Sequence, residues 1–150
     1  MMTIRGVEPH EWPTAFAACG QRFFDERRLP GTFDLQRAVM VWSALNQAMP
    51  AVLIVACAEG QIVGGIGALI MQDEYSEHRF GAEVFWYVQR EHRHGTAGLR
   101  CLKAAEAWAS SYGITDFRLG EFRVDGLPGS NQHYLRMGYV PFYTVYRKEL

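Results

Sequence analysis

Neither sign of charge is in excess in this sequence. It carries 15 lysine and arginine residues against 16 aspartate and glutamate residues, a formal net charge of −1 over 150 residues. Proteins that bind nucleic acid usually carry a basic excess, because neutralisation of phosphates dominates their affinity. The balance therefore argues against a nucleic-acid partner.

Long apolar runs are also missing. The longest candidate, residues 62–71, is shorter than the ~20 residues that cross a bilayer, and it contains three glycines. The N-terminal stretch MMTIRGVEPHEW lacks the apolar core of a signal peptide. These absences predict a protein without a membrane partner and with a cytoplasmic location.

Cysteine is sparse, and no two cysteines form a C-x-x-C pair. Cys19, Cys57 and Cys101 are far apart, as expected for reduced thiols in a cytosolic protein. A zinc site needs histidines with cysteine or carboxylate partners at ligand spacing. No such partners accompany the histidines at positions 78, 92, 94 and 133, so the sequence predicts no metal.

What is present is an apolar content of 49%, typical of a globular chain, at a length that fits one domain over residues 1–150. Hydrophobic periodicity predicts strands over 3–7, 51–58, 61–71, 80–89 and 115–122, and one or two more over 139–148. It predicts four helices, over 10–28, 33–47, 96–112 and 131–137. The order indicates an α/β (α+β) fold, in which a single mixed sheet of six to seven strands is flanked by helices.

One segment, residues 86–99, carries the most chemistry. A strand with Val84, Trp86 and Val88 on one face, and Phe85 and Tyr87 on the other, runs into a basic turn and then into a helix. Unpaired N–H groups and the positive end of the helix dipole meet at such a helix start, which favours a phosphate or pyrophosphate.

The residue types in this turn suit a phosphate. Gly95, Ala97 and Gly98 let a ligand approach the backbone, Arg93 adds charge, and Thr96 is placed to cap the helix or donate its hydroxyl. The turn is not a Walker A loop, because no Gly-Lys-Ser/Thr ends it. It also lacks the G-x-G-x-x-G spacing of a dinucleotide site.

With these residues the sequence resembles the GNAT (GCN5-related) N-acetyltransferase superfamily over nearly its whole length. The phosphate signature of the family is R/Q-x-x-G-x-G/A after a strand that ends in an apolar-x-Val pattern. Here Trp86-x-Val88 and Arg93-x-x-Thr96-x-Gly98 occupy those places. Thr96 departs from the usual glycine, so altered packing of the pyrophosphate is expected.

A second resemblance lies at Tyr134-Leu135-Arg136-Met137-Gly138-Tyr139, similar to the Y-x-x-x-G-F/Y of the family. In many members this tyrosine protonates the departing coenzyme A thiolate, which implies a general acid role for Tyr134. The asparagine that often lies seven residues earlier is replaced here by Leu127, so Asn131 becomes the candidate contact to the coenzyme. Glu83, on the strand that leads to the loop, is the candidate general base.

The resemblance implies a mostly antiparallel sheet and transfer of an acetyl group from acetyl-CoA to a primary amine of a small molecule or protein, by direct attack in a ternary complex. It places the coenzyme on Trp86, Val88, Arg93, His94, Gly95, Thr96, Ala97, Gly98 and Asn131. The Val88 N–H is the candidate oxyanion donor. Two alternatives use the same fold. One is a non-catalytic acyl-CoA-binding sensor or interaction module; the other is an RNA- or protein-modifying toxin, whose RNA-directed form the charge balance disfavours.

The acceptor amine is open at this level. An acidic group formed by Asp73, Glu74 and Glu77 could attract a cationic amine such as a polyamine, an aminoglycoside or a lysine side chain, or could simply be a solvated loop. The aromatic residues Phe142, Tyr143 and Tyr146 could line the acceptor site or form the seam of a homodimer.

Overall fold

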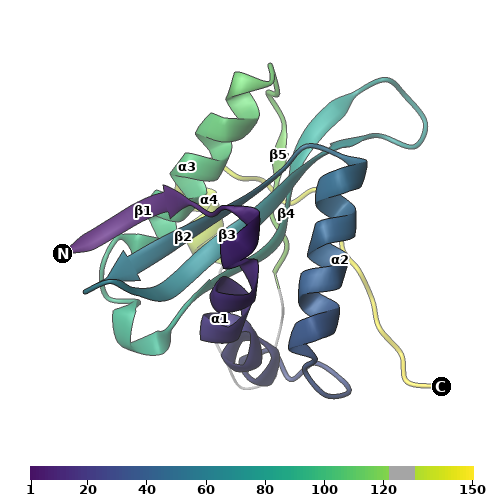
Figure 1. Ribbon diagram of the computed structural model, residues 1–150. Helices are drawn as coiled ribbons and strands as arrows, with labels where there is room; N and C mark the ends of the chain where they lie inside the picture. Colours follow the sequence, from purple (N-terminus) through teal and green to yellow (C-terminus); the bar gives the residue numbers. More distant parts are fainter. Residues whose placement is uncertain (122–130) are drawn as a thin grey trace. The chain divides into compact units, whose positions relative to one another are not determined.

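The computed structural model of the chain describes residues 1–121 and 131–150. These residues divide into two compact units, Met1–Gly120 and Glu121–Leu150. The first unit contains the whole sheet that the structure describes, and the second contains one short helix (Figure 1).

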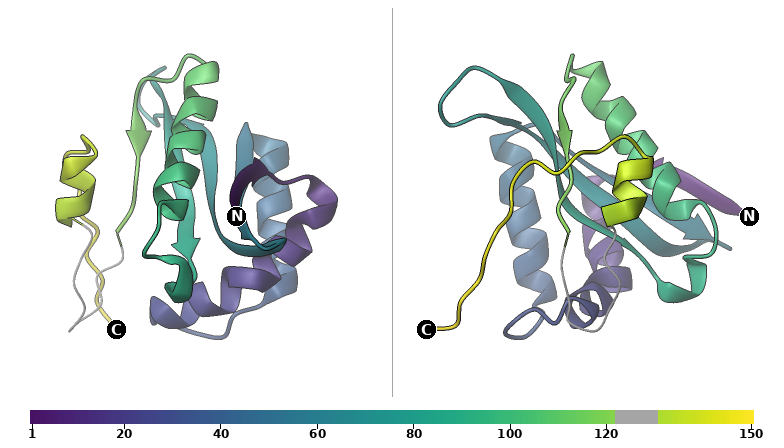
Figure 2. Two further views of the ribbon diagram at one scale, coloured as in Figure 1. Left: turned by 90° about the vertical axis from the view of Figure 1, so that its left-hand side faces the viewer. Right: turned by 180° about the vertical axis from the view of Figure 1, so that it is seen from behind.

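The first unit is an open sheet with helices on both faces. Its elements are β1 (Met2–Gly6), the 3-10 turn η1 (Pro9–Glu11), α1 (Trp12–Glu26), α2 (Leu35–Ala48), β2 (Ala51–Ala58), β3 (Gln61–Gln72), β4 (Arg79–Val88), the 3-10 turn η2 (Arg90–His92), α3 (Ala97–Ser111) and β5 (Phe117–Arg118). The five strands lie in the order β1-β2-β3-β4-β5, antiparallel except for the parallel pair β4 and β5. The edge-on view in Figure 2 (left) shows α3 on one face and α1 and α2 on the other. The predicted fold class is confirmed.

Local signals in the sequence account for several element boundaries. The strand predicted over 51–58 is β2, and it joins β3 through Glu59 and Gly60, which both have positive φ (47° and 79°). Two consecutive residues of this kind make the tight hairpin turn that matches strand twist. Asp34 caps α2 by accepting a hydrogen bond from the Arg37 N–H at 3.0 Å.

The predicted count of six to seven strands is wrong for the described residues, which contain five. β5 spans two residues instead of 115–122, and residues 139–148 contain no strand. A strand exists only where ladder hydrogen bonds join it to a neighbour. An alternating aromatic pattern such as that of 139–148 does not supply a partner by itself. The loop predicted over 125–130 lies outside the described residues.

The second unit contains α4 (Asn131–Arg136). As predicted, the helix ends at a glycine: Gly138 has φ 90° and donates its N–H to the Leu135 carbonyl at 3.1 Å. The rings of Tyr134 and Tyr139 then pack with centroids 6.4 Å apart. The short helix and the turn after it therefore form a small aromatic cluster.

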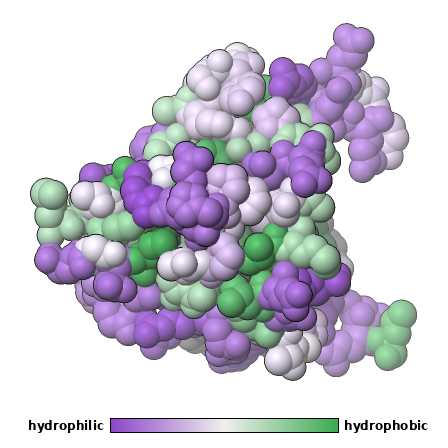
Figure 3. All heavy atoms as spheres, in the orientation of Figure 1, coloured by the Kyte–Doolittle hydropathy of each residue, from purple (hydrophilic) through white to green (hydrophobic). Residues whose placement is uncertain are grey.

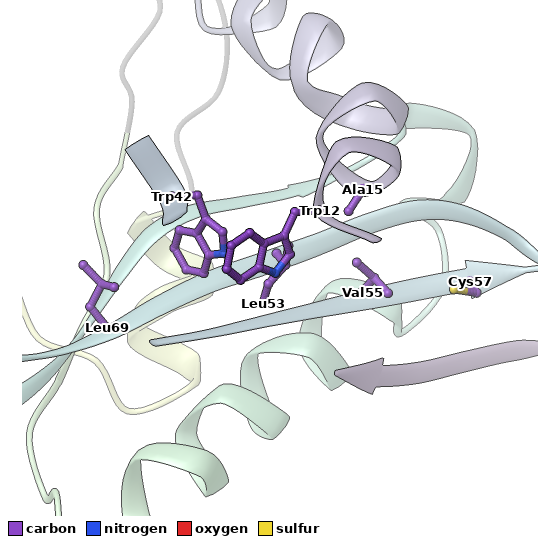
Figure 4. Packing of buried hydrophobic residues seen from close by; sticks show 7 residues of the cluster. All are labelled: Trp12, Ala15, Trp42, Leu53, Val55, Cys57 and Leu69. Carbon is purple, nitrogen blue, oxygen red and sulfur yellow. The ribbon is translucent and has the colours of Figure 1, made fainter. Parts of the chain in front are cut away.

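The core between the sheet and the first two helices is built around two tryptophans. Trp12 of α1 and Trp42 of α2 cluster with residues of β2 and β3, as Figure 4 shows: Leu53, Val55, Cys57 and Leu69, together with Ala15 of α1. All seven residues are buried. This cluster fixes both helices on one face of the sheet.

On the visible face, hydrophobic residues reach the surface between α1 and α2 in a small group surrounded by hydrophilic residues (Figure 3). Among the helices of the described residues, none has both the length and the apolar character required to cross a membrane.

The opposite face is held by α3, where Leu102 is completely buried and Leu99 is 39% exposed. We expect Leu102→Ala to lower the free energy of unfolding by about 2–5 kcal/mol, because it leaves a cavity in a packed core. Leu99→Ala, the same change one turn earlier, should lower it by less than about 1 kcal/mol. Urea denaturation of both variants measures the difference. Equal losses would contradict the described packing of α3.

Candidate active site

Strand β4 parts from β5 after only two residue pairs. Gly81 pairs with Phe117 and Ala82 with Arg118, but β4 continues to Val88. At the point of parting, the Gly120 N–H donates to Oε2 of Glu83 at 3.0 Å, so a side chain takes the place of a ladder bond. Within the described residues, β4 is therefore paired only with β3 from residue 83 onward.

A bulge in β4 lies next to this point. A Cβ at Gly81 would lie 3.3 Å from the Ala109 Cβ, so position 81 faces α3. Phe85 instead packs against Trp42 on the other face, with ring centroids 5.7 Å apart. Along a regular strand every second side chain lies on the same face, so positions 81 and 85 should share one. Because they do not, the alternation of side chains is interrupted between them.

The extra residue is Val84. The register joins Gly67 to Phe85 and Ala68 to Glu83, which leaves Val84 without a partner and 40% exposed. The prediction that Val84 shares a face with Trp86 and Val88 stays a prediction, because a bulge residue does not follow the period of two.

The edge of β4 that faces away from β3 carries the main-chain groups of Trp86 and Val88. The Gln89 N–H donates to Val63 of β3 at 2.8 Å, and antiparallel pairing alternates along the strand, so Val88 and Trp86 point their N–H and carbonyl groups away from β3. Two arginines cap the carbonyls. Nε of Arg93 donates to Val88 at 2.6 Å, and Nη2 of Arg27 donates to Trp86 at 3.5 Å.

After β4, the chain makes the η2 turn and enters α3 through an exposed loop that contains His94, Gly95 and Thr96. The first bond of the helix runs from the Arg100 N–H to the Thr96 carbonyl at 2.9 Å. The N–H groups of Ala97, Gly98 and Leu99 thus precede the helical ladder and point out of the helix start. A Cβ at Gly95 would meet no atom within 4 Å, so the space beside the loop is open.

Thr96 is the N-cap residue, but its side chain makes no capping bond. Its φ and ψ of −100° and 6° are not the extended conformation in which a side-chain oxygen reaches the N–H groups of the first turn. The predicted capping role is therefore wrong.

Trp86, Val88 and Gly98 come together where the strand meets the helix. Nε1 of Trp86 donates to the Gly98 carbonyl at 3.2 Å. A Cβ at Gly98 would lie 3.5 Å from Cγ2 of Val88 and 3.6 Å from the Trp86 ring, an ordinary contact distance. A Cβ at position 98 would therefore fit, and the close approach of α3 to the end of β4 does not require a glycine.

Arg93 is held by the end of α1. Besides its bond to Val88, its Nη2 lies 2.6 Å from Oε2 of Glu26, and its guanidinium lies over the Tyr87 ring at 5.0 Å. The Tyr87 hydroxyl donates to the other oxygen of Glu26 at 2.9 Å. The guanidinium of Arg93 is therefore shared with Glu26, which limits what it can offer to a phosphate.

These contacts shift two pKa values. Burial acts to raise the pKa of Glu26, but hydrogen bonds from Arg93 and Tyr87 outweigh it and lower that pKa. Burial, followed by the bond to Glu26, raises the pKa of Tyr87 to about 12. Glu26 is therefore ionised and Tyr87 protonated at neutral pH.

Glu83 is in a different environment. Burial raises the pKa of its carboxyl, while the Gly120 N–H and the charge of Arg27 act in the opposite direction. A carboxyl with a raised pKa at a parting of strands is chemically suited to accept a proton.

The remaining predicted residues are less constrained. Tyr134 is half-buried on α4 and Asn131 opens that helix, both in the second unit. Their predicted roles stay predictions. Asp73, Glu74 and Glu77 belong to the turn between β3 and β4, where Asp73 Oδ1 accepts from the Tyr75 N–H at 2.8 Å. Within residues 1–121 and 131–150, no three His, Cys, Asp or Glu side chains are grouped so that they could hold a metal ion.

The sequence-based reasoning missed Glu26 and Arg27. They lie at the end of α1, 59 to 67 residues before their partners on β4 and in the loop. No local pattern joins residues so far apart, so the sequence carries no signal for this contact.

The family model described as "Acetyltransferase (GNAT) family" matches residues 10–139, a stretch that reaches into both units. The match covers well over half of the chain, and the protein belongs to the GNAT acetyltransferase family. Among curated proteins, none matches its sequence.

Solved structures share the fold at low sequence identity. An acetyltransferase of Clostridium acetobutylicum determined with acetyl-CoA is 13% identical, with a TM-score of 0.76 over 99% of this chain and 96% of that one. An aminoglycoside acetyltransferase from an uncultured soil metagenome, in complex with sisomicin, is 16% identical, with a TM-score of 0.73 over 99% and 96%. The ribosomal-protein-alanine N-acetyltransferase of Brucella melitensis is 15% identical, with a TM-score of 0.72 over 100% and 99%. At such identities, the likeness establishes the fold.

The contact between Glu26 and Arg93 can be tested against a matched pair on the same two segments. Arg22 and Glu91 also join α1 to the turn before the loop, at 3.1 Å, but Glu91 is 63% exposed. We expect Glu26→Ala to lower the free energy of unfolding by about 1–2 kcal/mol, because it leaves Arg93 and Tyr87 without their acceptor. Glu91→Ala should stay within about 0.5 kcal/mol of the parent.

Urea denaturation measures both variants, and amide hydrogen exchange over residues 90–98 measures the loop directly. Faster exchange in Glu26→Ala alone supports the assignment. Equal exchange in the two variants would show that Glu26 does not hold the loop.

Proposed function

We propose that the protein transfers the acetyl group of acetyl-CoA to a primary amine of a small molecule or protein, by direct attack in a ternary complex. The observation that carries the proposal is the parting of β4 from β5 after Ala82, followed, after the η2 turn and an exposed loop, by the start of α3 at Ala97. A main-chain edge followed by a cluster of free N–H groups suits an extended amide-containing chain that ends in a pyrophosphate. Coenzyme A has this form.

In this proposal the pyrophosphate takes hydrogen bonds from the loop and from the N–H groups of Ala97 and Gly98, next to His94 and Gly95. The pantetheine arm lies along Trp86 and Val88 as an added strand. The space beside Gly95 and the short side chains at 97 and 98 fit a bulky anion. Arg93 contributes its main chain and, shared with Glu26, part of its charge.

The chemistry is attack of the amine nitrogen on the thioester carbonyl carbon. A C–N bond forms and the C–S bond breaks, so the nitrogen loses a proton and the sulfur gains one. Glu83 accepts the proton of the amine, directly or through water, and Tyr134 donates a proton to the thiolate. The Val88 N–H, on the free edge of β4, stabilises the oxygen that becomes negative during the attack.

The pH dependence tests the base. Because burial raises the pKa of Glu83, its ionised fraction, and hence kcat/KM, should rise with pH through a value above that of a free glutamate. We expect Glu83→Gln to lower kcat by roughly 100-fold or more and to abolish the rise of kcat/KM with pH. Tyr134→Phe should lower kcat but keep that rise. Steady-state assays on a verified acceptor amine decide the point. If both variants keep full turnover, the acid and base assignments are wrong.

Calorimetry tests the coenzyme. Acetyl-CoA and free CoA should bind in the micromolar range, about −8 kcal/mol, and ATP should not. Gly98→Glu should abolish binding, because it adds a negative charge at the helix start and a side chain against Trp86. Ala107→Glu, an exposed position on the same helix, is the control and should bind normally.

Unchanged acetyl-CoA affinity in Gly98→Glu would show that the coenzyme does not bind at this loop. Binding of both CoA species without acetylation of any amine would favour the non-catalytic acyl-CoA-binding module. The single domain over 1–150, the cytoplasmic location and a homodimer remain predictions.

A further inference from the structure

A cavity of about 190 Å³ lies in the first unit between the sheet and helices α1 and α2. Six aromatic residues line it, together with small and aliphatic ones: Phe16, Phe23, Phe24, Phe33, Phe85 and Tyr87. Of the described residues that line it, none carries a charged side chain. The hydrophobic group that reaches the surface between α1 and α2 in Figure 3 is on the same side of the sheet.

The chemistry of the wall favours an apolar occupant over water. A buried water needs two to four polar partners. The Tyr87 hydroxyl is already bonded to Glu26, and burial raises the pKa of the Cys19 thiol to about 11, so that thiol is neutral. An apolar cavity of about 150 Å³ is known to stay dry and to bind benzene. This cavity has room for one aromatic ring with a short side chain.

The cavity adjoins the candidate active site through β4. Phe85 and Tyr87 of its wall alternate along the strand with Trp86 and Val88, whose main-chain groups point away from β3. The cavity lies on the face of the sheet covered by α1 and α2, whereas α3, with the proposed coenzyme site at its start, covers the other face (Figure 2). In a direct attack, the amine has to reach the thioester from a side that acetyl-CoA does not occupy. If acetyl-CoA binds at the start of α3, the face covered by α1 and α2 is left for the acceptor amine.

A polar group borders the cavity on the side of the strand edge. The Arg27 guanidinium lies over the Phe23 ring at 5.0 Å and 3.5 Å from the Trp86 carbonyl, between the cavity wall and the outer edge of β4. Glu26, which accepts the hydrogen bond of the Tyr87 hydroxyl, lies at the same helix end. The border is therefore polar where the wall is apolar, so the ring of an acceptor suits the cavity and its nitrogen suits the border.

We propose that this cavity binds the aromatic ring of the acceptor, and that the substrates are primary amines with one aromatic ring on a short linker. The inference rests on the proposed acetyl transfer for the role of the amine, but the ring site itself can be tested without turnover.

The binding test uses ethylbenzene, which has the ring but no amine. It should shift the methyl NMR signals of Leu53 and Val55 and raise the melting temperature of the full chain. Ala38→Leu adds volume at a half-buried wall position. In this variant, at least a tenfold higher ethylbenzene concentration should be needed for the same methyl shifts and the same rise in melting temperature. Ala44→Leu, the same change at an exposed position of α2, should leave them unchanged. If ethylbenzene shifts no methyl signal in the parent protein, the ring site is wrong.

The activity test compares 2-phenylethylamine with ethylamine and spermidine. We expect kcat/KM for 2-phenylethylamine to be at least tenfold higher than for either, and to fall at least tenfold in Ala38→Leu but not in Ala44→Leu. Equal kcat/KM for the three amines, without ethylbenzene binding, would overturn the ring site and leave acetyl transfer intact. Ethylbenzene binding without acetylation of any amine would overturn acetyl transfer. Competition of ethylbenzene with hexanoyl-CoA, and not with the amine, would assign the cavity to the acyl donor and overturn the proposal.

Discussion

The proposed active site depends on the loss of pairing between β4 and β5 after Ala82. A central strand has both edges occupied, but from Glu83 onward the described residues pair β4 with β3 alone. The side chain of Glu83 accepts the Gly120 N–H at this point. The bulge at Val84 lies at the same place and interrupts the alternation of side chains along β4. A strand edge that has left β5 and a carboxyl with a raised pKa thus meet at one local departure from regular sheet structure.

An unpaired edge is also a liability, since it invites pairing with any extended chain. Here the end of α1 protects it. Arg27 donates to the Trp86 carbonyl, and Arg93 donates to the Val88 carbonyl. Glu26, at the end of α1, holds Arg93 in place. The contact between the rings of Phe23 and Tyr87 packs the same helix end against β4. A coenzyme that pairs with the edge has to share these carbonyls with the arginines. The α1 helix therefore contributes to the proposed coenzyme site, although it is no part of the sequence motif that predicts this site.

Much of this could be predicted from the sequence, and the rest could not, for physical reasons. β2, the turn at Glu59 and Gly60 and the helix stop at Gly138 depend on local preferences, which a short window of sequence contains. The sequence of strand end, turn and helix start from Trp86 to Gly98 also depends on local preferences, and it was predicted. The bulge at Val84 and the length of β5 depend on partners in distant strands, so periodicity gave no sign of the bulge and predicted too long a strand over 115–122. The contact of Glu26 with Arg93 joins residues 67 apart, and no local pattern could indicate it.

In the proposed site, the two faces of β4 have different roles in binding the acceptor and the coenzyme. A charged ammonium would lose its hydration in the apolar cavity without compensation, so a ligand held there must keep its nitrogen outside, toward the strand edge. In the proposed site, Glu83, with a pKa raised by burial, is then able to take the proton of that nitrogen. Binding of the ring on one face and deprotonation of the amine at the strand edge would thus depend on the same strand.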